Sequence, residues 1–273
     1  MAGDTNATIT SGGIERSYIL HIPPQYDGNT PLPLVLNFHG FGSSAPRQAT
    51  YSGVPAKADT EGFVVATPDG TGTPPSWNNA KIAGAPDDVQ FVRDLLDKLT
   101  AELCIDESRI YAVGISNGAA MVQRLACDLP ESITGIAPVA FTFKPFVCDS
   151  RTPVPVIAFH GTEDACVPYE GGPVTCGRGS GGIALPSVEA GAATWAAHNG
   201  CNPAPSQAQL TEHVRTTAYS ECRDEVAVVL YTVEGGGHTW PGALDVPRLG
   251  AVTHEINATD LIWEFFEAQA AIR

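Results

Sequence analysis

Residues 109–118 read RIYAVGISNG, an apolar run that ends in the pentapeptide Gly114-Ile115-Ser116-Asn117-Gly118. The run Arg109–Ile115 predicts a strand buried on both faces, and Asn117–Leu129 predicts the helix that follows it. The two glycines leave room for a tight turn, which would hold Ser116 strained and exposed at the helix N-terminus. A bare G-x-S-x-G pattern often marks a simple turn in glycine-rich chains. Between a buried strand and a helix, it indicates a nucleophilic serine.

The chain on either side of this segment alternates between strand and helix patterns. The further predicted strands are Arg16–Ile22, Leu32–Phe38, Gly62–Thr67, Ile133–Ala140, Val154–Phe159 and Val226–Val233. The further predicted helices are Asp88–Leu103, Ser187–Asn199 and Asn257–Ala271. Such alternation predicts an α/β fold, with a mostly parallel sheet covered by helices on both faces. No Pro/Ser/Thr-rich linker or internal repeat divides the sequence, so we expect a single domain over residues 1–273.

The composition describes a folded, acidic chain. Of its 273 residues 43% are hydrophobic and 16% are charged, which disfavours disorder and allows a substantial core without metals. The formal net charge is −15, and phosphate backbones and anionic membrane surfaces repel such a surface. We therefore expect no nucleic acid and no membrane as partners. The sequence also contains no apolar run of the 18 residues that would indicate a membrane span.

A serine nucleophile needs a general base, and His238 is the best placed of the seven histidines. It lies in Gly235-Gly236-Gly237-His238-Thr239-Trp240-Pro241-Gly242, after the last predicted strand and before the last predicted helix. The glycines before it allow close backbone approach. We interpret His39 as a structural turn residue. Four other histidines lie within or beside ordinary elements and are also interpreted as structural: His21, His198, His213 and His254.

The acid that orients the base should follow a strand between Ser116 and His238. Strand Val154–Phe159 is followed by His160-Gly161-Thr162-Glu163-Asp164, which places Asp164 in the loop at its carboxyl end. Glu163 is the nearest rival. Asp69 follows an earlier strand and therefore comes too early in the chain order.

An oxyanion hole needs two backbone N–H groups that point at the developing alkoxide. One should come from Asn117, directly after the nucleophile. The other should come from the loop after strand Leu32–Phe38, in which Phe41 is the favoured donor and Gly40 the alternative.

These motifs together resemble the secreted feruloyl-esterase and polyhydroxybutyrate-depolymerase-like branch of the α/β hydrolases. The matching segments run nearly end to end: Arg16–Pro23, His39–Ser43, Thr67-Pro68-Asp69-Gly70, Asp87-Asp88-Val89, Gly114–Met121, His160–Tyr169 and Gly235–Gly242. The resemblance implies an α/β-hydrolase fold and ester hydrolysis through an acyl-enzyme, with no metal and no organic cofactor. Its triad corresponds to Ser116, Asp164 and His238, and the segment Val167-Pro168-Tyr169 favours Asp164 over Glu163.

The substrate is less well defined than the bond that is cleaved. Trp77, Phe41 and Trp240 are candidates for an aromatic acyl cleft, although Trp240 could equally pack the histidine loop. We expect a feruloyl ester of plant polysaccharide, with a polyhydroxybutyrate-type polyester or acetylated xylan as alternatives. A peptidase or acyltransferase of the same fold, or a catalytically silent binding protein, is a weaker hypothesis, because the intact triad indicates an enzyme but does not select the acceptor.

Seven cysteines are many for a reducing cytosol and favour export to an extracellular or periplasmic space. Met1-Ala2-Gly3-Asp4 reads either as an engineered start or as a mature N-terminus from which any signal peptide has been removed. We expect a monomer with three disulfides and one buried free thiol at Cys127. The expected pairs are Cys104–Cys148, at one end of two neighbouring strands, Cys201–Cys222, before the last strand, and Cys166–Cys176. The last pair would close the long glycine-rich stretch Ala165–Leu185, and loops of that length are usually functional or tied down.

Overall fold

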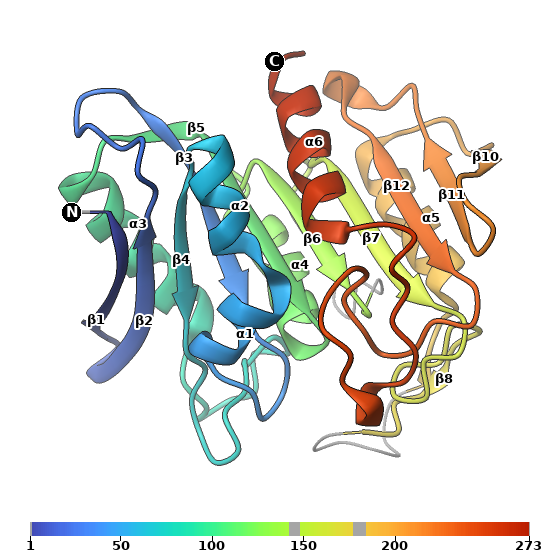
Figure 1. Cartoon of the computed structure of the whole chain (residues 1–273), viewed down its shortest axis with the longest axis horizontal. Helices are drawn as coiled ribbons and strands as arrows, with labels where there is room; N and C mark the ends of the chain where they lie inside the picture. Colours follow the sequence, from blue (N-terminus) through green and yellow to red (C-terminus); the bar gives the residue numbers. More distant parts are fainter. Residues whose placement is uncertain (1, 142–147, 177–183, 273) are drawn as a thin grey trace.

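A ten-stranded sheet forms the centre of the molecule, with strand order β1-β2-β4-β3-β5-β6-β7-β12-β11-β10 (Figure 1). The computed structural model describes residues 2–141, 148–176 and 184–272. The strands in this order are β1 (Gly3–Ser11), β2 (Ile14–Ile22), β4 (Val64–Pro68), β3 (Leu32–Phe38), β5 (Ile105–Ile115), β6 (Gly135–Val139), β7 (Val156–Gly161), β12 (Val228–Val233), β11 (Val214–Tyr219) and β10 (Ser206–Gln209). A separate small hairpin pairs β8 (Gly172–Pro173) with β9 (Ala184–Leu185).

The middle of the sheet is parallel and its two edges are antiparallel. Strands β4, β3, β5, β6, β7 and β12 pair in parallel. At one edge β2 runs antiparallel to β4 and to β1, and at the other β11 runs antiparallel to β12 and to β10. Parallel strands all have their carboxyl ends on the same side of the sheet. The loops after β3, β5, β7 and β12 therefore meet on that side, which is called the carboxyl edge of the sheet below.

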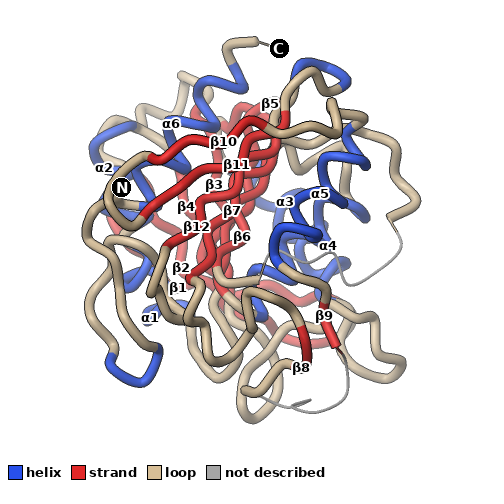
Figure 2. The backbone as a smooth tube through the Cα atoms, turned by 90° about the vertical axis from the view of Figure 1, so that its right-hand side faces the viewer, coloured by secondary structure: helices blue, strands red, loops and turns tan. Residues whose placement is uncertain are grey.

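Helices cover both faces of the sheet, which Figure 2 shows edge-on. One face carries α3 (Asp88–Glu102), α4 (Asn117–Asp128) and α5 (Val188–Asn199), and the other carries α1 (Ala45–Ser52), α2 (Val54–Glu61) and α6 (Ala258–Ala270). Short 3-10 turns form at Arg223–Glu225 and Pro247–Leu249. Within the described ranges, no helix combines the length and the apolar character needed to cross a membrane.

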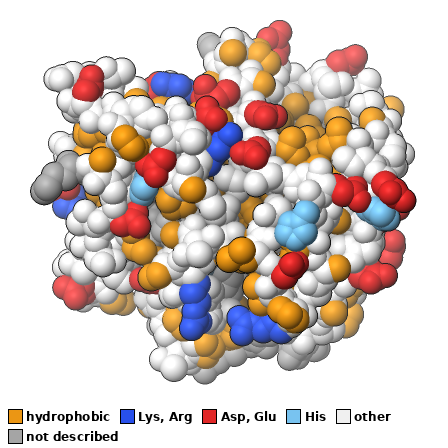
Figure 3. Space-filling model, in the orientation of Figure 1, with side chains coloured by type: hydrophobic (Ala, Val, Ile, Leu, Met, Phe, Trp, Pro, Cys, Tyr) orange, Lys and Arg blue, Asp and Glu red, His pale blue; other side chains and the backbone are white. Residues whose placement is uncertain are grey.

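Each helical layer packs on the sheet through its own hydrophobic cluster. Side chains of α3, α4 and α5, among them Leu95, Met121 and Trp195, form one cluster with inward-facing strand residues. The other cluster joins α2 and α6 to the opposite sheet face, and in it Phe266 stacks on Tyr111 at 4.2 Å between ring centroids. Acidic side chains are spread over the outer surface with fewer basic ones between them, as Figure 3 shows for one face.

The architecture confirms the predicted α/β-hydrolase class. Strand β3 has the predicted bounds, and the other predicted strands and helices are present with ends shifted by a few residues. The prediction omitted β1, β10 and β11 at the sheet edges, because polar residues interrupt their apolar pattern. It also omitted the short helices α1 and α2. Part of the irregular stretch Ala165–Leu185, residues 177–183, lies outside the described residues.

The disulfide pattern corrects one predicted pair. Cys127 on α4 is bonded to Cys148, with 5.3 Å between their Cα atoms, and Cys104 is the free thiol. The prediction of Cys104–Cys148, with Cys127 free, was wrong because it assumed that β5 and β7 are neighbours. Strand β6 lies between them. The pairs Cys166–Cys176 and Cys201–Cys222 are those that the sequence indicated.

We expect peptide mapping of the unfolded, unreduced protein to find one alkylated cysteine, Cys104, and a peptide pair linked through Cys127 and Cys148. A thiol outside every bridge reacts once unfolding exposes it, whereas a bridged sulfur does not. Recovery of alkylated Cys127, or of a Cys104–Cys148 peptide, would contradict this pairing.

Candidate active site

Ser116 stands at the turn between β5 and α4 in a backbone conformation that residues other than glycine rarely adopt. Its φ is 58° and its ψ is −121°, and its N–H donates to Val139 O at 2.9 Å. The flanking glycines permit this turn: a Cβ on Gly118 would lie 2.4 Å from Phe38 O, and one on Gly114 would lie 2.8 Å from the Gly118 backbone. Strain held in this way is typical of functional positions and presents the half-buried serine at the sheet edge.

The N–H of Asn117 lies at the N-terminal end of α4, next to Ser116. It belongs to the first residue of the helix, and the first N–H groups of a helix have no partner within it. The Asn117 side chain is engaged elsewhere, since its Oδ1 accepts from Trp77 N at 2.7 Å and its Nδ2 donates to Trp77 O at 3.2 Å. These two bonds tie the loop that carries Trp77 to the residue after the nucleophile.

The turn after β3 lies against the serine from the other side. A Cβ on Gly40 would lie 3.3 Å from Ser116 Cβ, so this residue must be small for the turn to approach. Phe41 follows it and is half-buried. The turn is fixed by a bond from Gly42 N to Pro75 O of 2.8 Å. Asn117 therefore follows Ser116 directly, and Gly40, the residue before Phe41, lies against it from the other side.

His39 is a structural part of this turn rather than a second base. Its Nδ1 lies 2.7 Å from Gly40 O and its Nε2 lies 2.9 Å from Gly70 N. One ring nitrogen thus donates and the other accepts, which is the pattern of a neutral imidazole. Burial lowers the pKa of His39 below its ordinary value, which favours the same neutral form.

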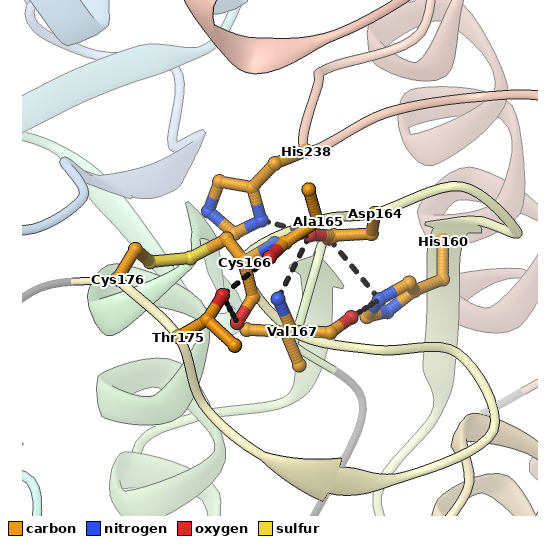
Figure 4. The surroundings of a disulfide bond; sticks show 8 residues. All are labelled: His160, Asp164, Ala165, Cys166, Val167, Thr175, Cys176 and His238. Atoms are coloured by element: carbon orange, nitrogen blue, oxygen red, sulfur yellow. Dashed lines mark hydrogen bonds and ion pairs between the residues drawn. A yellow bond between two sulfur atoms is a disulfide. The ribbon is translucent and has the colours of Figure 1, made fainter. Parts of the chain in front are cut away.

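Asp164 and His238 form a buried pair at the same edge of the sheet (Figure 4). The Nδ1 atom of His238 lies 2.7 Å from Oδ2 of Asp164, and the Asp164 side chain is fully buried. The other carboxylate oxygen, Oδ1, accepts from Cys166 N and from Val167 N, each at 2.8 Å. Burial alone would raise the pKa of Asp164, but hydrogen bonds from His160 and His238 outweigh it and hold that pKa well below its usual range.

His160 is a second imidazole on the same carboxylate, and the sequence did not identify it. Its Nε2 lies 2.9 Å from Val167 O and 3.2 Å from Asp164 Oδ2, so this nitrogen must carry a proton. Its side chain is fully buried at the end of β7. The one available signal was a histidine at the end of a buried strand, four residues before the predicted acid.

The loops that carry Asp164 and His238 are packed directly on each other. A Cβ on Gly161 would lie 2.1 Å from Gly236 O, and one on Gly237 would lie 2.4 Å from Leu249 O. Backbone bonds join the two loops as well, with Glu163 N donating to Gly236 O at 2.9 Å. The glycines before His238 therefore allow the close backbone approach between the two loops, as the sequence predicted.

Asp164 and His238 are in contact, whereas among the described residues Ser116 Oγ makes no hydrogen bond to His238. Such bonds are often long in free enzymes and shorten when substrate is bound. The topology places all three residues at the carboxyl ends of parallel strands of one sheet, since β5, β7 and β12 run in the same direction and only β6 separates β5 from β7.

Both tryptophans are buried, which does not fit the predicted role of lining an acyl cleft. Trp77 is 4% exposed, packs edge-on against Phe38 and donates from Nε1 to His39 O at 2.8 Å. Trp240 is 1% exposed and donates from Nε1 to Thr259 Oγ1 at 3.0 Å, so it packs beneath the histidine loop. Their role is to support the loops of the site. Of the predicted set, only Phe41, which follows Gly40 in the turn, is half-buried rather than buried.

One group of metal-ligating side chains occurs within the described ranges. The ligand atoms of Cys166, Cys176 and His238 lie within 4.8 Å of one another. The two sulfurs are joined as a disulfide, however, and metal ligation by cysteine requires thiolates. In this oxidised state the group therefore does not offer a complete ligand set.

Comparison with known proteins places the chain in a family. It is 33% identical over 230 residues to feruloyl esterase B of Piromyces equi, a match that covers 82% of this chain and 42% of that protein. It is 30% identical to the putative esterase NocK of Nocardia uniformis subsp. tsuyamanensis, with 97% of this chain and 83% of that protein covered. This chain belongs to the feruloyl-esterase-like family of α/β hydrolases. Both relatives are named as esterases, and this chain is a carboxylic ester hydrolase.

Among solved structures, this feruloyl-esterase-like protein is similar to the acetyl xylan esterase from Aspergillus awamori. The TM-score is 0.67, with 96% of this chain and 99% of the other covered, at 13% sequence identity. At that identity the likeness shows the shared fold. A scan against protein-family models found no match.

The assignment of the acid can be tested with a neighbouring carboxylate as control. We expect Asp164→Asn to lower kcat by about 10⁴-fold, because an amide stabilises neither the required tautomer nor the charged form of His238. The exposed Glu163 makes no comparable contact, so Glu163→Gln should keep kcat within about twofold. The measurement is steady-state hydrolysis of p-nitrophenyl acetate. A larger loss in the Glu163 variant than in the Asp164 variant would reverse the assignment.

Proposed function

We propose that this protein hydrolyses feruloyl (hydroxycinnamoyl) esters of plant polysaccharide through an acyl-enzyme on Ser116. The observation that carries the proposal is the strained, half-buried Ser116 at the same sheet edge as the buried Asp164–His238 pair. A serine held in this way, beside an imidazole fixed by a carboxylate, is the constellation of acyl transfer.

The reaction follows from these groups. His238 accepts the Ser116 proton as Oγ attacks the ester carbonyl, and Asp164 holds the imidazole and stabilises its charged form. The backbone N–H groups of Phe41 and Asn117 receive the oxyanion. His238 then gives its proton to the leaving alcohol, and a water activated by the same histidine releases the acid and restores Ser116.

Two observations support a neutral or weakly charged substrate outside the cell. The surface carries a net charge of −15, which would repel polyanions. Three disulfides are compatible with an oxidising space, so we propose that the protein acts after export. The feruloyl group itself is proposed from the names of relatives such as feruloyl esterase B.

The nucleophile is tested by Ser116→Ala. We expect turnover of methyl ferulate to fall by at least ~10³-fold, because loss of a triad member leaves only the oxyanion hole and substrate binding. Ser206→Ala, on the exposed edge strand β10, is the matched control and should retain activity. A fluorophosphonate should label the wild-type peptide that contains Ser116. Turnover near the wild-type rate in Ser116→Ala would exclude this mechanism.

The acyl group is tested separately with a panel of esters. We expect the largest kcat/KM for methyl ferulate, compared with acetylated xylan and hydroxybutyrate oligomers, and we expect free acid as the product. Preference for acetylated xylan or for the oligomers would replace the feruloyl group and leave the nucleophile unchanged. Transfer to an added amine or alcohol in place of water would indicate an acyltransferase.

A further inference from the structure

The Cys166–Cys176 disulfide lies directly against the proposed acid and base (Figure 4). Cys166 comes two residues after Asp164, and the bridge spans a sequence separation of 10. Both sulfurs lie within 4.8 Å of a ring nitrogen of His238. The other two disulfides are elsewhere, since Cys127 is on α4 and Cys201 follows α5.

We propose that the Cys166–Cys176 disulfide is a positioning element of the triad, and that full esterase activity requires this bridge to be oxidised. The inference rests on the proposed roles of Asp164 and His238. It assigns the bridge a function in turnover in addition to any contribution to stability.

The bridge fixes the backbone that holds the carboxylate. Cys166 N and Val167 N both donate to Asp164 Oδ1, so the direction of residues 165–167 sets the orientation of the carboxyl group. The far side of the loop is bonded to the same segment, because Thr175 N donates to Cys166 O at 2.9 Å and Thr175 Oγ1 donates to Ala165 O. The disulfide closes this contact covalently at the next residue, Cys176.

Tyr169 anchors this loop in the cluster that packs α3, α4 and α5 on the sheet. The other buried residues among the described part of the loop, Cys166, Val167 and Leu185, form a small cluster that is separate from the two clusters on the sheet, so little further apolar packing holds the segment next to Asp164 without the bridge. Cys176 itself is exposed. Segments with few buried apolar contacts open locally at low free-energy cost, so the covalent link carries a large share of the order here.

The bridge also restricts the base. His238 must keep Nδ1 on Asp164 while its other ring nitrogen serves Ser116. The adjacent sulfurs occupy space into which the imidazole could otherwise turn. Displacements of about 1 Å in such a site can cost about 10²-fold in rate.

The Cys201–Cys222 disulfide supplies the matched control. Cys201 lies just after α5, where Asn199 bonds to Val154 at the amino end of β7, so this bridge is at the opposite end of the sheet from Asp164. Removing either disulfide should lower the thermal midpoint, because each constrains the unfolded chain. Only one of them lies beside the triad.

The first test compares the full-length double variants C166A/C176A and C201A/C222A with the wild type, at a temperature where circular dichroism shows all three folded. With p-nitrophenyl acetate we expect C166A/C176A to lower kcat by about 10–100-fold with KM within about twofold. The rate of fluorophosphonate labelling of Ser116 should fall in parallel. C201A/C222A should keep kcat within about twofold.

The second test uses the wild-type protein and a dithiol reductant. Thiol–disulfide exchange converts the bridge into two thiols while dithiothreitol is oxidised to its cyclic disulfide, so two electrons and two protons pass to the protein. We expect loss of kcat to follow the fraction of reduced Cys166–Cys176, measured by alkylation and mass spectrometry, and to reverse on reoxidation with oxidised glutathione.

Wild-type kcat in folded C166A/C176A, or an equal kcat loss in both double variants, would overturn the positioning role. These results are distinguishable from failure of the proposed mechanism. If Ser116→Ala and Asp164→Asn abolish turnover while C166A/C176A does not, only the role of the bridge is wrong. If Ser116→Ala is active, the triad itself is wrong.

Discussion

The buried carboxylate of Asp164 is the constraint on which the rest of the site depends. Its side chain is fully buried, and an ion in that position is costly unless hydrogen bonds replace its water. The donors come from three places: the turn that follows it, the end of β7 through His160, and the loop after β12 through His238. Satisfying the carboxylate therefore requires β7, β12 and their loops to be assembled correctly, and the orientation of the base is a consequence of that assembly.

Close backbone contacts determine how these segments meet. Gly161 lies against Gly236 so tightly that any side chain would overlap the opposing carbonyl, and Gly118 has the same relation to Phe38 and His39. The first contact joins the acid loop to the base loop, and the second joins the nucleophile turn to the proposed oxyanion turn. Packing of this kind leaves no room for adjustment by side-chain rotation, so the main chain sets the relative positions of the groups that we propose to be catalytic.

These properties explain what the sequence could and could not predict. Continuous apolar runs such as Leu32–Phe38 report burial on both faces, and they were sufficient to identify the parallel strands and the loops that follow them. Polar edge strands such as β10 lack that pattern. The pairing of Cys127 with Cys148 depends on β6 lying between β5 and β7, and strand order is not encoded in any local pattern.

Side-chain roles within the site were harder to predict for a related reason. An aromatic residue in a catalytic loop can face the substrate or the core, and only the packing decides that Trp240 faces the core. The role of His160 depends on a turn that folds the chain back so that Val167 and Asp164 both face one ring nitrogen. Such geometry is a property of the assembled loop rather than of residue spacing.

A buried ion pair supports the part of the site that contains Asn117, the proposed oxyanion donor. Arg16 on β2 donates to Asp88 Oδ1 at 2.7 Å, and Asp88 Oδ2 accepts from Asn78 N at 2.6 Å. The preceding residue, Trp77, forms two backbone hydrogen bonds with the side chain of Asn117. Removing one member of a buried pair typically costs about 3–5 kcal/mol, because the remaining charge is left without a partner. The cost of losing Arg16 would fall first on the Asp88–Asn78 contact and through it on the residue after the nucleophile. The two halves of the candidate site therefore have separate supports: glycine contacts and the adjacent disulfide for Asp164 and His238, and a buried arginine for Asn117, the proposed oxyanion donor.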